Sequence, residues 1–169
     1  PNNRFLRSAR IKDARADALR YMVRLSYPEE YRAKHPTYGA PQPGFDLIGA
    51  FYDHAAATFD GLEQRKVLRL TNQFAPGVLM PDYFAHLPEN RVPRGRALVT
   101  LTEDGGVGNG AELMRQFGVA LQARGIAVRT RHRVTRLVQG ARGAVLGVEV
   151  QREDGKTLRI RAHGGVVFA

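Results

Sequence analysis

The residues best suited to chemistry lie in a loop that is rich in titratable and aromatic side chains, residues 81–90 (PDYFAHLPEN). Tyr83 is the candidate catalytic residue of this loop, because a tyrosine can donate or accept a proton when its pKa is shifted. Long ordered loops carry function more often than the elements they connect. A packed surface loop with ordinary polar groups remains the alternative.

A glycine run, Gly106-Val107-Gly108-Asn109-Gly110-Ala111, fits the pattern G-x-G-x-x-G/A. In a dinucleotide-binding fold such a loop follows a strand and opens a helix, whose backbone N–H groups hold a pyrophosphate. The preceding strand is weak here, and Arg129 and Arg131 stand where a ribose-binding Asp or Glu is needed. We favour a glycine-rich entry to a helix and keep a small NAD-type domain over residues 97–131 as a rival.

Metal chemistry finds little support in the sequence. The chain has no cysteine. None of its five histidines forms a helical i, i+4 pair with another histidine or joins a plausible set of carboxylates. No metal site is therefore predicted, and no G-x-S-x-G motif points to a serine hydrolase. Absence of cysteine is compatible with a reducing compartment, and we expect a cytoplasmic protein.

The net charge of +10 comes mainly from arginine, since only four of the 26 basic residues are lysines. One interpretation is a non-enzymatic module that binds polyanions through Arg129, Arg131 and Arg133, which share one face if they lie on a strand. No stacking aromatics accompany these arginines, so nucleic acid is not a predicted partner. No run of about 18 apolar residues spans a membrane, and contact with a membrane surface stays open.

Hydrophobic periodicity and turn residues predict an alternation of helices, strands and loops. Helices are expected over residues 13–25, with Asp13 as N-cap and Tyr27-Pro28 at the end, over 45–64, and over 111–124 before Gly125. Strands are expected over residues 67–70, 97–101, 126–130, 134–138, 145–151, 157–162 and 165–169. Irregular segments are expected over residues 1–10, 31–44 and 72–96.

The order of these elements in the last third of the chain is a composite. A helix followed by a strand is typical of α/β folds, three short alternating strands are typical of an antiparallel meander, and a final apolar strand is again α/β. The fold class is therefore predicted as α/β, with an antiparallel β-meander inserted into a sheet and a helical, loop-rich segment before it. The predicted domains are residues 1–104 and 105–169, and the composite looks cut from a larger protein.

Several segments resemble one enzyme family. They are residues 110–116 (GAELMRQ), 123–126 (ARGI), 132–137 (HRVTRL), 143–148 (GAVLGV) and 165–169 (GVVFA). They look like the FAD-dependent oxidoreductases that include fumarate reductase flavoproteins and 3-ketosteroid dehydrogenases. Tyr83 and residues 94–96 (RGR) look more like the ketosteroid dehydrogenase branch than the dicarboxylate branch. The family's FAD domain, a parallel sheet with an inserted meander, accounts for the composite order.

The resemblance implies FAD as the cofactor and hydride transfer between FAD and a substrate carbon. The backbone of Val134, between Arg133 and Thr135, matches the position that meets the flavin's adenine. Asn2 lies in a segment similar to the one after a glycine-rich flavin loop, and Ala169 matches a strand end beside the cofactor. Tyr83 matches a tyrosine that moves protons.

The same resemblance implies what the substrate is and what the chain lacks. An apolar, ring-shaped substrate of the steroid kind is our first expectation, and a dicarboxylate is the second. The loops over residues 31–44 and 72–96 would border the substrate opening. Because no segment here supplies the family's dinucleotide fingerprint, we expect a central segment of the flavoprotein that binds FAD weakly by itself.

Overall fold

The computed structural model describes residues 2–168. The chain divides into two compact units, the N-terminal unit (residues 1–124) and the C-terminal unit (residues 125–169). The domains predicted from the sequence, which divide after residue 104, concern the parent enzyme fold and remain a prediction.

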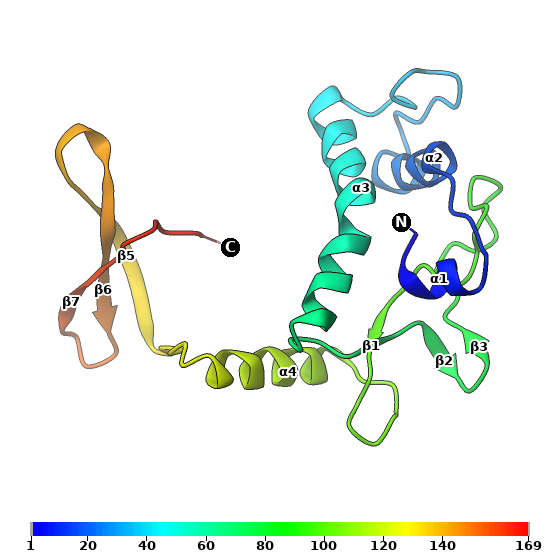
Figure 1. Cartoon of the computed structure of the whole chain (residues 1–169). Helices are drawn as coiled ribbons and strands as arrows, with labels where there is room; N and C mark the ends of the chain where they lie inside the picture. The colour runs from blue at the N-terminus through cyan, green and yellow to red at the C-terminus, as the bar shows by residue number, and fades with distance from the viewer. Residues whose placement is uncertain (1, 169) are drawn as a thin grey trace. The chain divides into compact units, whose positions relative to one another are not determined.

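Three helices open the N-terminal unit: α1 (Arg4–Ser8), α2 (Arg15–Ser26) and α3 (Gln42–Gln64) (Figure 1). The first lies where the sequence predicted an irregular lead-in, so that prediction is wrong. Asn3 explains the helix, because its side chain accepts hydrogen bonds from the N–H groups of Phe5 and Leu6 and caps the first turn. Leu6 is then fully buried in the core.

The other two helices agree with the prediction except at their starts. Ala14, not Asp13, is the N-cap of α2, and the carboxylate of Asp13 is used inside the unit instead. Tyr27 ends α2 as predicted. Helix α3 begins three residues earlier than expected, because Pro43 suits the first turn of a helix.

Four short strands form two antiparallel sheets in this unit. The pairs are β1 (Leu70–Thr71) with β4 (Val99–Thr100), and β2 (Gln73–Ala75) with β3 (Val78–Leu79). The strands β1 and β4 overlap the predicted strands, whereas β2 and β3 form a hairpin inside a segment predicted as irregular. Strands of two or three residues leave almost no alternation to read.

Helix α4 (Gly110–Ala123) completes the N-terminal unit and agrees with the prediction. Asn109 caps its start by accepting from the N–H groups of Ala111 and Glu112. Gly125 follows its end with a φ of 65°, which is the left-handed geometry that glycine adopts after a helix.

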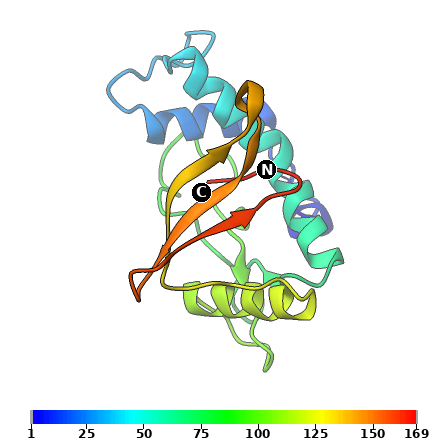
Figure 2. The ribbon, with the colours of Figure 1, turned by 90° about the vertical axis from the view of Figure 1, so that its left-hand side faces the viewer.

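The C-terminal unit is a three-stranded antiparallel meander of β5 (His132–Gln139), β6 (Val145–Arg152) and β7 (Thr157–Arg161), in that spatial order (Figure 2). All three strands were predicted. The strands expected over residues 126–130 and 165–169 are absent from the described residues. Neither segment finds a described partner strand, and Val167 is 92% exposed. Ala169 lies outside the described residues.

The fold class is confirmed as mixed α/β, with an antiparallel meander and a helical, loop-rich part. Every strand pair among the described residues is antiparallel. Within residues 2–168, no helix has both the length and the apolar character needed to cross a membrane.

Candidate functional site: an apolar cavity and an open strand edge

The N-terminal unit contains a cavity of about 740 Å³ that is open to solvent on one side. Helix α2 contributes Tyr21 and Met22 to its wall, and α3 contributes Phe51 and Phe59. The remaining wall comes from the strand β4 region and from the segment around Tyr83. The full lining is Asn3, Ala18, Tyr21, Met22, Leu25, Phe51, Ala55, Ala56, Phe59, Phe74, Met80, Pro81, Asp82, Tyr83, Phe84, Arg96, Ala97, Leu98 and Val99. The cavity is therefore mostly apolar with a few polar groups, the usual composition of a small-molecule site.

A chain of charged groups lies behind one part of this wall. Arg96 donates from Nε and Nη2 to the two carboxylate oxygens of Asp13, at 2.8 and 2.7 Å. Its Nη1 atom donates to Asp82 Oδ2 at 3.2 Å and to Asn90 Oδ1 at 2.6 Å. The Arg96 side chain is 9% exposed and the Asp13 side chain is fully buried. A bidentate pair of this kind fixes both groups in place.

Two pKa shifts reflect this environment. Burial alone would raise the pKa of Asp13, but nearby positive charge, with the hydrogen-bonded Arg96 guanidinium as its largest contributor, holds that pKa below its ordinary value. Burial raises the pKa of the Tyr21 hydroxyl, and the negative charge of Asp82 raises it further. The network therefore keeps Asp13 ionised and Tyr21 neutral.

Tyr83, the predicted catalytic residue, belongs to the cavity lining but is fully exposed. It follows Asp82 directly, so the Arg96 network anchors the residue beside it. No described residue forms a hydrogen bond with its hydroxyl. The structure thus brings Tyr83 to the cavity with a free hydroxyl group, and its catalytic role remains a prediction.

Asn2, predicted to meet the cofactor, uses its side chain inside the N-terminal unit. Its Nδ2 atom donates to the Asp13 carbonyl at 3.0 Å and to the Tyr52 hydroxyl at 3.2 Å. Its Oδ1 atom accepts from the Asp13 N–H at 2.7 Å. These contacts hold the segment that carries Asp13, and they leave the predicted cofactor contact of Asn2 a prediction.

The glycine run forms a tight turn and does not resemble a phosphate-binding loop. The N–H of Gly108 donates to the Thr100 carbonyl at 2.8 Å, and the N–H of Gly105 donates to the Thr102 carbonyl at 3.1 Å. The N–H of Gly106 donates to the Asp104 carboxylate. The Asn109 side chain accepts from the N–H groups of Ala111 and Glu112 in the first turn of α4. The N–H groups of Gly106, Gly108 and Ala111 are thus already hydrogen-bonded within the chain, which argues against the NAD-type rival.

The second site feature is the outer edge of β5. This strand is the edge strand of the meander, and no described strand pairs with its outer side. The hydrogen-bond direction follows from the bonds at both ends of β6. The backbone N–H of Arg152 donates to the Lys156 carbonyl at 2.8 Å, and the backbone N–H of Ala162 donates to the Leu146 carbonyl at 2.9 Å. Because directions alternate along an antiparallel strand, the even-numbered residues of β6 face β7 and the odd-numbered ones face β5.

This alternation sets the direction of the Val134 backbone. Gln151 of β6 faces β5 and pairs with Arg133, so the next residue, Val134, points its N–H and C=O away from β6. A β-bulge follows between Val134 and Arg136. Val134 is 42% exposed. One donor and one acceptor of the backbone are therefore available at the open edge, at the position that the resemblance predicted.

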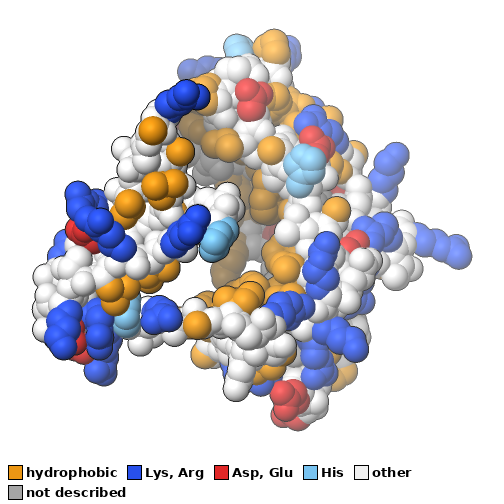
Figure 3. All heavy atoms as spheres, turned by 60° about the vertical axis from the view of Figure 1, so that its left-hand side comes forward, with side chains coloured by type: hydrophobic (Ala, Val, Ile, Leu, Met, Phe, Trp, Pro, Cys, Tyr) orange, Lys and Arg blue, Asp and Glu red, His pale blue; other side chains and the backbone are white. Residues whose placement is uncertain are grey.

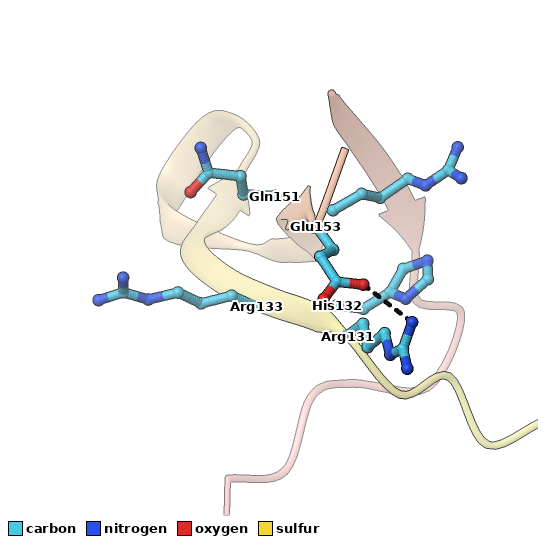
Figure 4. Close-up of a pocket in the computed structure, with 6 residues that line it drawn as sticks. Arg131, His132, Arg133, Gln151 and Glu153 are labelled. Atoms are coloured by element: carbon cyan, nitrogen blue, oxygen red, sulfur yellow. Dashed lines mark hydrogen bonds and ion pairs between the residues drawn. The ribbon is translucent and has the colours of Figure 1, made fainter. Parts of the chain in front are cut away.

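The residues around Val134 are exposed, except for the half-buried His132. Arg131, His132, Arg133, Gln151, Arg152 and Glu153 line a recess of about 470 Å³ (Figure 4). Arg131 pairs with Glu153 at 3.1 Å, whereas Arg133 extends in another direction. The Thr135 hydroxyl donates to the Glu149 carbonyl at 3.2 Å. Arg133 and Thr135 are thus near the open edge, and their contact with a cofactor stays a prediction.

The structure separates the arginines that the polyanion interpretation placed together. Strand β5 begins at His132, and Arg131 has a φ of 58°, so the alternation that would align Arg129, Arg131 and Arg133 is interrupted. Lysine and arginine side chains are scattered over the visible face (Figure 3). The shared face predicted for these three arginines is wrong, and the polyanion interpretation loses its main argument.

Sequence reasoning missed the charged network. Asp13 was assigned to a helix cap, and Asp82 was read only as part of a titratable loop. Arg96 was noticed through the resemblance of residues 94–96 without a role. The hint in the sequence was the presence of these residue types, because an arginine or an aspartate that becomes buried in a core requires a charged partner.

A family model described as an FAD binding domain matches residues 18–169, which is most of the chain. A comparison with curated proteins finds no match. The matched range includes most of α2, all of α3 and the described meander. The chain therefore belongs to the FAD binding domain family of FAD-dependent oxidoreductases, and FAD is its cofactor.

Proposed function

We propose that the protein transfers hydride between FAD and a ring carbon of an apolar, steroid-like ketone. The observation that carries this proposal is the apolar cavity of about 740 Å³ in the N-terminal unit. Phe51, Phe59, Phe74 and Phe84 contribute aromatic side chains to its lining. Burying a rigid apolar ring system against such walls is favourable by about 25 cal/mol per Å² of apolar surface.

The same cavity argues against a dicarboxylate substrate. Among the described residues that line it, Arg96 alone is cationic, and Asp13 and Asp82 already engage its guanidinium. A substrate with two carboxylates would meet the negative charge of Asp82 without a free cation to offset it. A neutral substrate is therefore favoured over the dicarboxylate alternative.

Tyr83 is the proposed proton-transfer residue. Its free hydroxyl lies at the cavity lining, and a positioned tyrosine contributes about 10²–10⁴-fold to such reactions. The neighbouring Asp82 is fixed by Arg96 and Asn90, so the backbone that carries Tyr83 is held in place.

The open edge of β5 fits the adenine end of FAD. Adenine presents one donor and one acceptor along an edge, and the outward N–H and C=O of Val134 complement this pair. When bound, FAD supplies the hydride chemistry, and the protein binds and orients it. Arg133, Thr135, Asn2 and Ala169 are proposed further contacts, of which Ala169 lies outside the described residues. We also propose a cytoplasmic location.

Anaerobic mixing of the FAD-loaded protein with candidate substrates tests the proposal. A 3-ketosteroid should bleach the visible absorbance of the oxidised flavin, whereas succinate should leave it unchanged. Bleaching by succinate without any response to ketosteroids would overturn the substrate assignment.

A further inference from the structure

One carboxylate oxygen in the cavity wall has no partner among the described residues. Asp82 Oδ2 accepts from Arg96 Nη1 and from Asn90 Nδ2, both at 3.2 Å. Asp82 Oδ1 accepts no hydrogen bond within residues 2–168. Asp82 belongs to the lining of the mostly apolar cavity, so we take this oxygen to be an acceptor that a ligand in the cavity can reach.

The position of this acceptor is well defined. The Asp82 side chain is 10% exposed, and both of its donors are held in turn. Asp13 binds Arg96 in a bidentate pair, and Asn90 accepts from Arg96 at 2.6 Å. Groups that are fixed before a ligand arrives lose little conformational entropy on binding. The Asp82 carboxylate is therefore preorganised as a hydrogen-bond acceptor.

The chemistry of a fitting ligand follows from this arrangement. A carboxylate accepts hydrogen bonds and donates none, so the matching ligand group is a donor. An anionic ligand group would be repelled, and a cationic group would have to be stripped of water beside apolar walls. A hydroxyl on a neutral ligand meets all three conditions, whereas a ketone oxygen at this place would leave two acceptors facing each other.

We propose that Asp82 is a specificity-determining residue, whose Oδ1 atom accepts a hydrogen bond from a hydroxyl at the end of an otherwise apolar substrate. The inference rests on the proposed function, because it names a feature of the same substrate. It adds that a hydroxylated ketosteroid binds better than a diketone of the same skeleton.

Three ketosteroids test the inference by calorimetric titration of the FAD-loaded protein. They share the ring-A ketone and differ only at the opposite ring, which carries a hydroxyl (testosterone), a ketone (androstenedione) or hydrogen. A charge-assisted hydrogen bond should favour the hydroxyl over the ketone by about tenfold or more in Kd. Equal affinities, or tighter binding of the diketone, overturn the role of Asp82 while the proposed function stands. Failure of all three to bind overturns both.

The variant Asp82→Asn gives a sharper result. Arg96 and Asn90 both donate to the Oδ2 position, so they keep the amide oxygen there and place the amide NH₂ at the Oδ1 position. The acceptor becomes a donor, and the preference should reverse in favour of the ketone. A general loss of packing would weaken all three ligands alike and would overturn the inference.

Asp53→Asn is the matched control, because Asp53 pairs with Arg15 on the exposed side of α3 and does not line the cavity. It should keep the preference for the hydroxyl. The comparison of ligands on the unmodified protein decides the inference even if Asp82→Asn does not fold.

Discussion

The two units differ in one ion pair, because the N-terminal unit holds exposed pairs and also one that is buried. In the N-terminal unit the ion pair of Asp13 and Arg96 is buried, with side chains that are 0% and 9% exposed. In the C-terminal unit Glu149, with a side chain that is 19% exposed, pairs with Arg136 and Arg159, whose side chains are 60% and 67% exposed. Buried pairs are sensitive to the loss of one partner, whereas exposed pairs contribute little. The N-terminal unit therefore specifies its site through fixed side chains.

The C-terminal unit offers a backbone instead. Its three strands satisfy one another except along the outer edge of β5, where Val134 presents an unpaired N–H and C=O. A site formed by backbone groups accepts many different side chains. It therefore depends on the register of the meander more than on any particular residue. We propose on this basis that the two units divide the work, with substrate selection in the cavity and cofactor recognition at the strand edge.

Replacing Asp13 by alanine should show the largest difference between the units. The change leaves Arg96 buried without its bidentate partner, which costs about 3–5 kcal/mol of unfolding free energy. Glu149→Ala, the matched change in the C-terminal unit, should cost less than about 1 kcal/mol. Denaturant unfolding measures both values, and equal losses would abolish the distinction between the two units.

The pH dependence of stability sharpens the same comparison. The pKa of Asp13 is lower in the folded protein than in the unfolded chain, so its contribution is complete above about pH 4 and is lost as the pH falls through the lowered value. The stability difference between the unmodified protein and Asp13→Asn should therefore shrink below about pH 4. A difference that stays constant down to acidic pH would contradict the ionised state of Asp13.

Tyr83→Phe tests the cavity as a reaction site. The ring remains and the hydroxyl is removed, so kcat should fall by about 100-fold while KM changes little. Steady-state kinetics with a ketosteroid measures both constants. Tyr38→Phe removes a hydroxyl that lies outside the cavity lining and should leave kcat unchanged. A normal kcat in Tyr83→Phe would exclude Tyr83 from proton transfer.

Two glycine substitutions test whether the turn before α4 has a structural role only. A methyl group on Gly108 would lie 2.5 Å from Thr100 Oγ1 and 2.8 Å from Glu112 Cβ, whereas one on Gly110 would meet nothing within 4 Å. Gly108→Ala should cost about 1–3 kcal/mol of stability through overpacking. Gly110→Ala should fold normally and keep its FAD affinity. Loss of FAD binding in folded Gly110→Ala would restore the dinucleotide-loop hypothesis.

The meander and the longer helices could be predicted from the sequence because local signals determine them. Strands β5 to β7 alternate over five to eight residues and are separated by glycine turns, and α4 has a cap at Asn109 and a stop at Gly125. The strands expected over residues 126–130 and 165–169 failed for the opposite reason. An apolar run becomes a strand only when a partner strand pairs with it.

The site was predictable only in part. The Val134 position came from resemblance and its contact with the cofactor stays a prediction, while the register of β5 and β6 directs its backbone N–H and C=O to the open edge. The network of Asp13, Asp82 and Arg96 joins residues that are up to 83 positions apart, so no local pattern contains it. Long-range pairing of buried charges is visible only after the chain is folded.

The most direct test of the cofactor assignment replaces Val134 by proline and compares the affinities for FAD and for FMN, which lacks the adenine. Proline removes the outward N–H of Val134 without removing a hydrogen bond to β6. Leu137→Pro is the matched control, because Leu137 also directs its N–H to the open edge, beyond the bulge. Fluorescence titration should show that Val134→Pro loses about tenfold in FAD affinity and keeps its FMN affinity. The control Leu137→Pro should not show this selective loss of FAD affinity. Equal FAD binding by the unmodified protein and Val134→Pro would contradict the account.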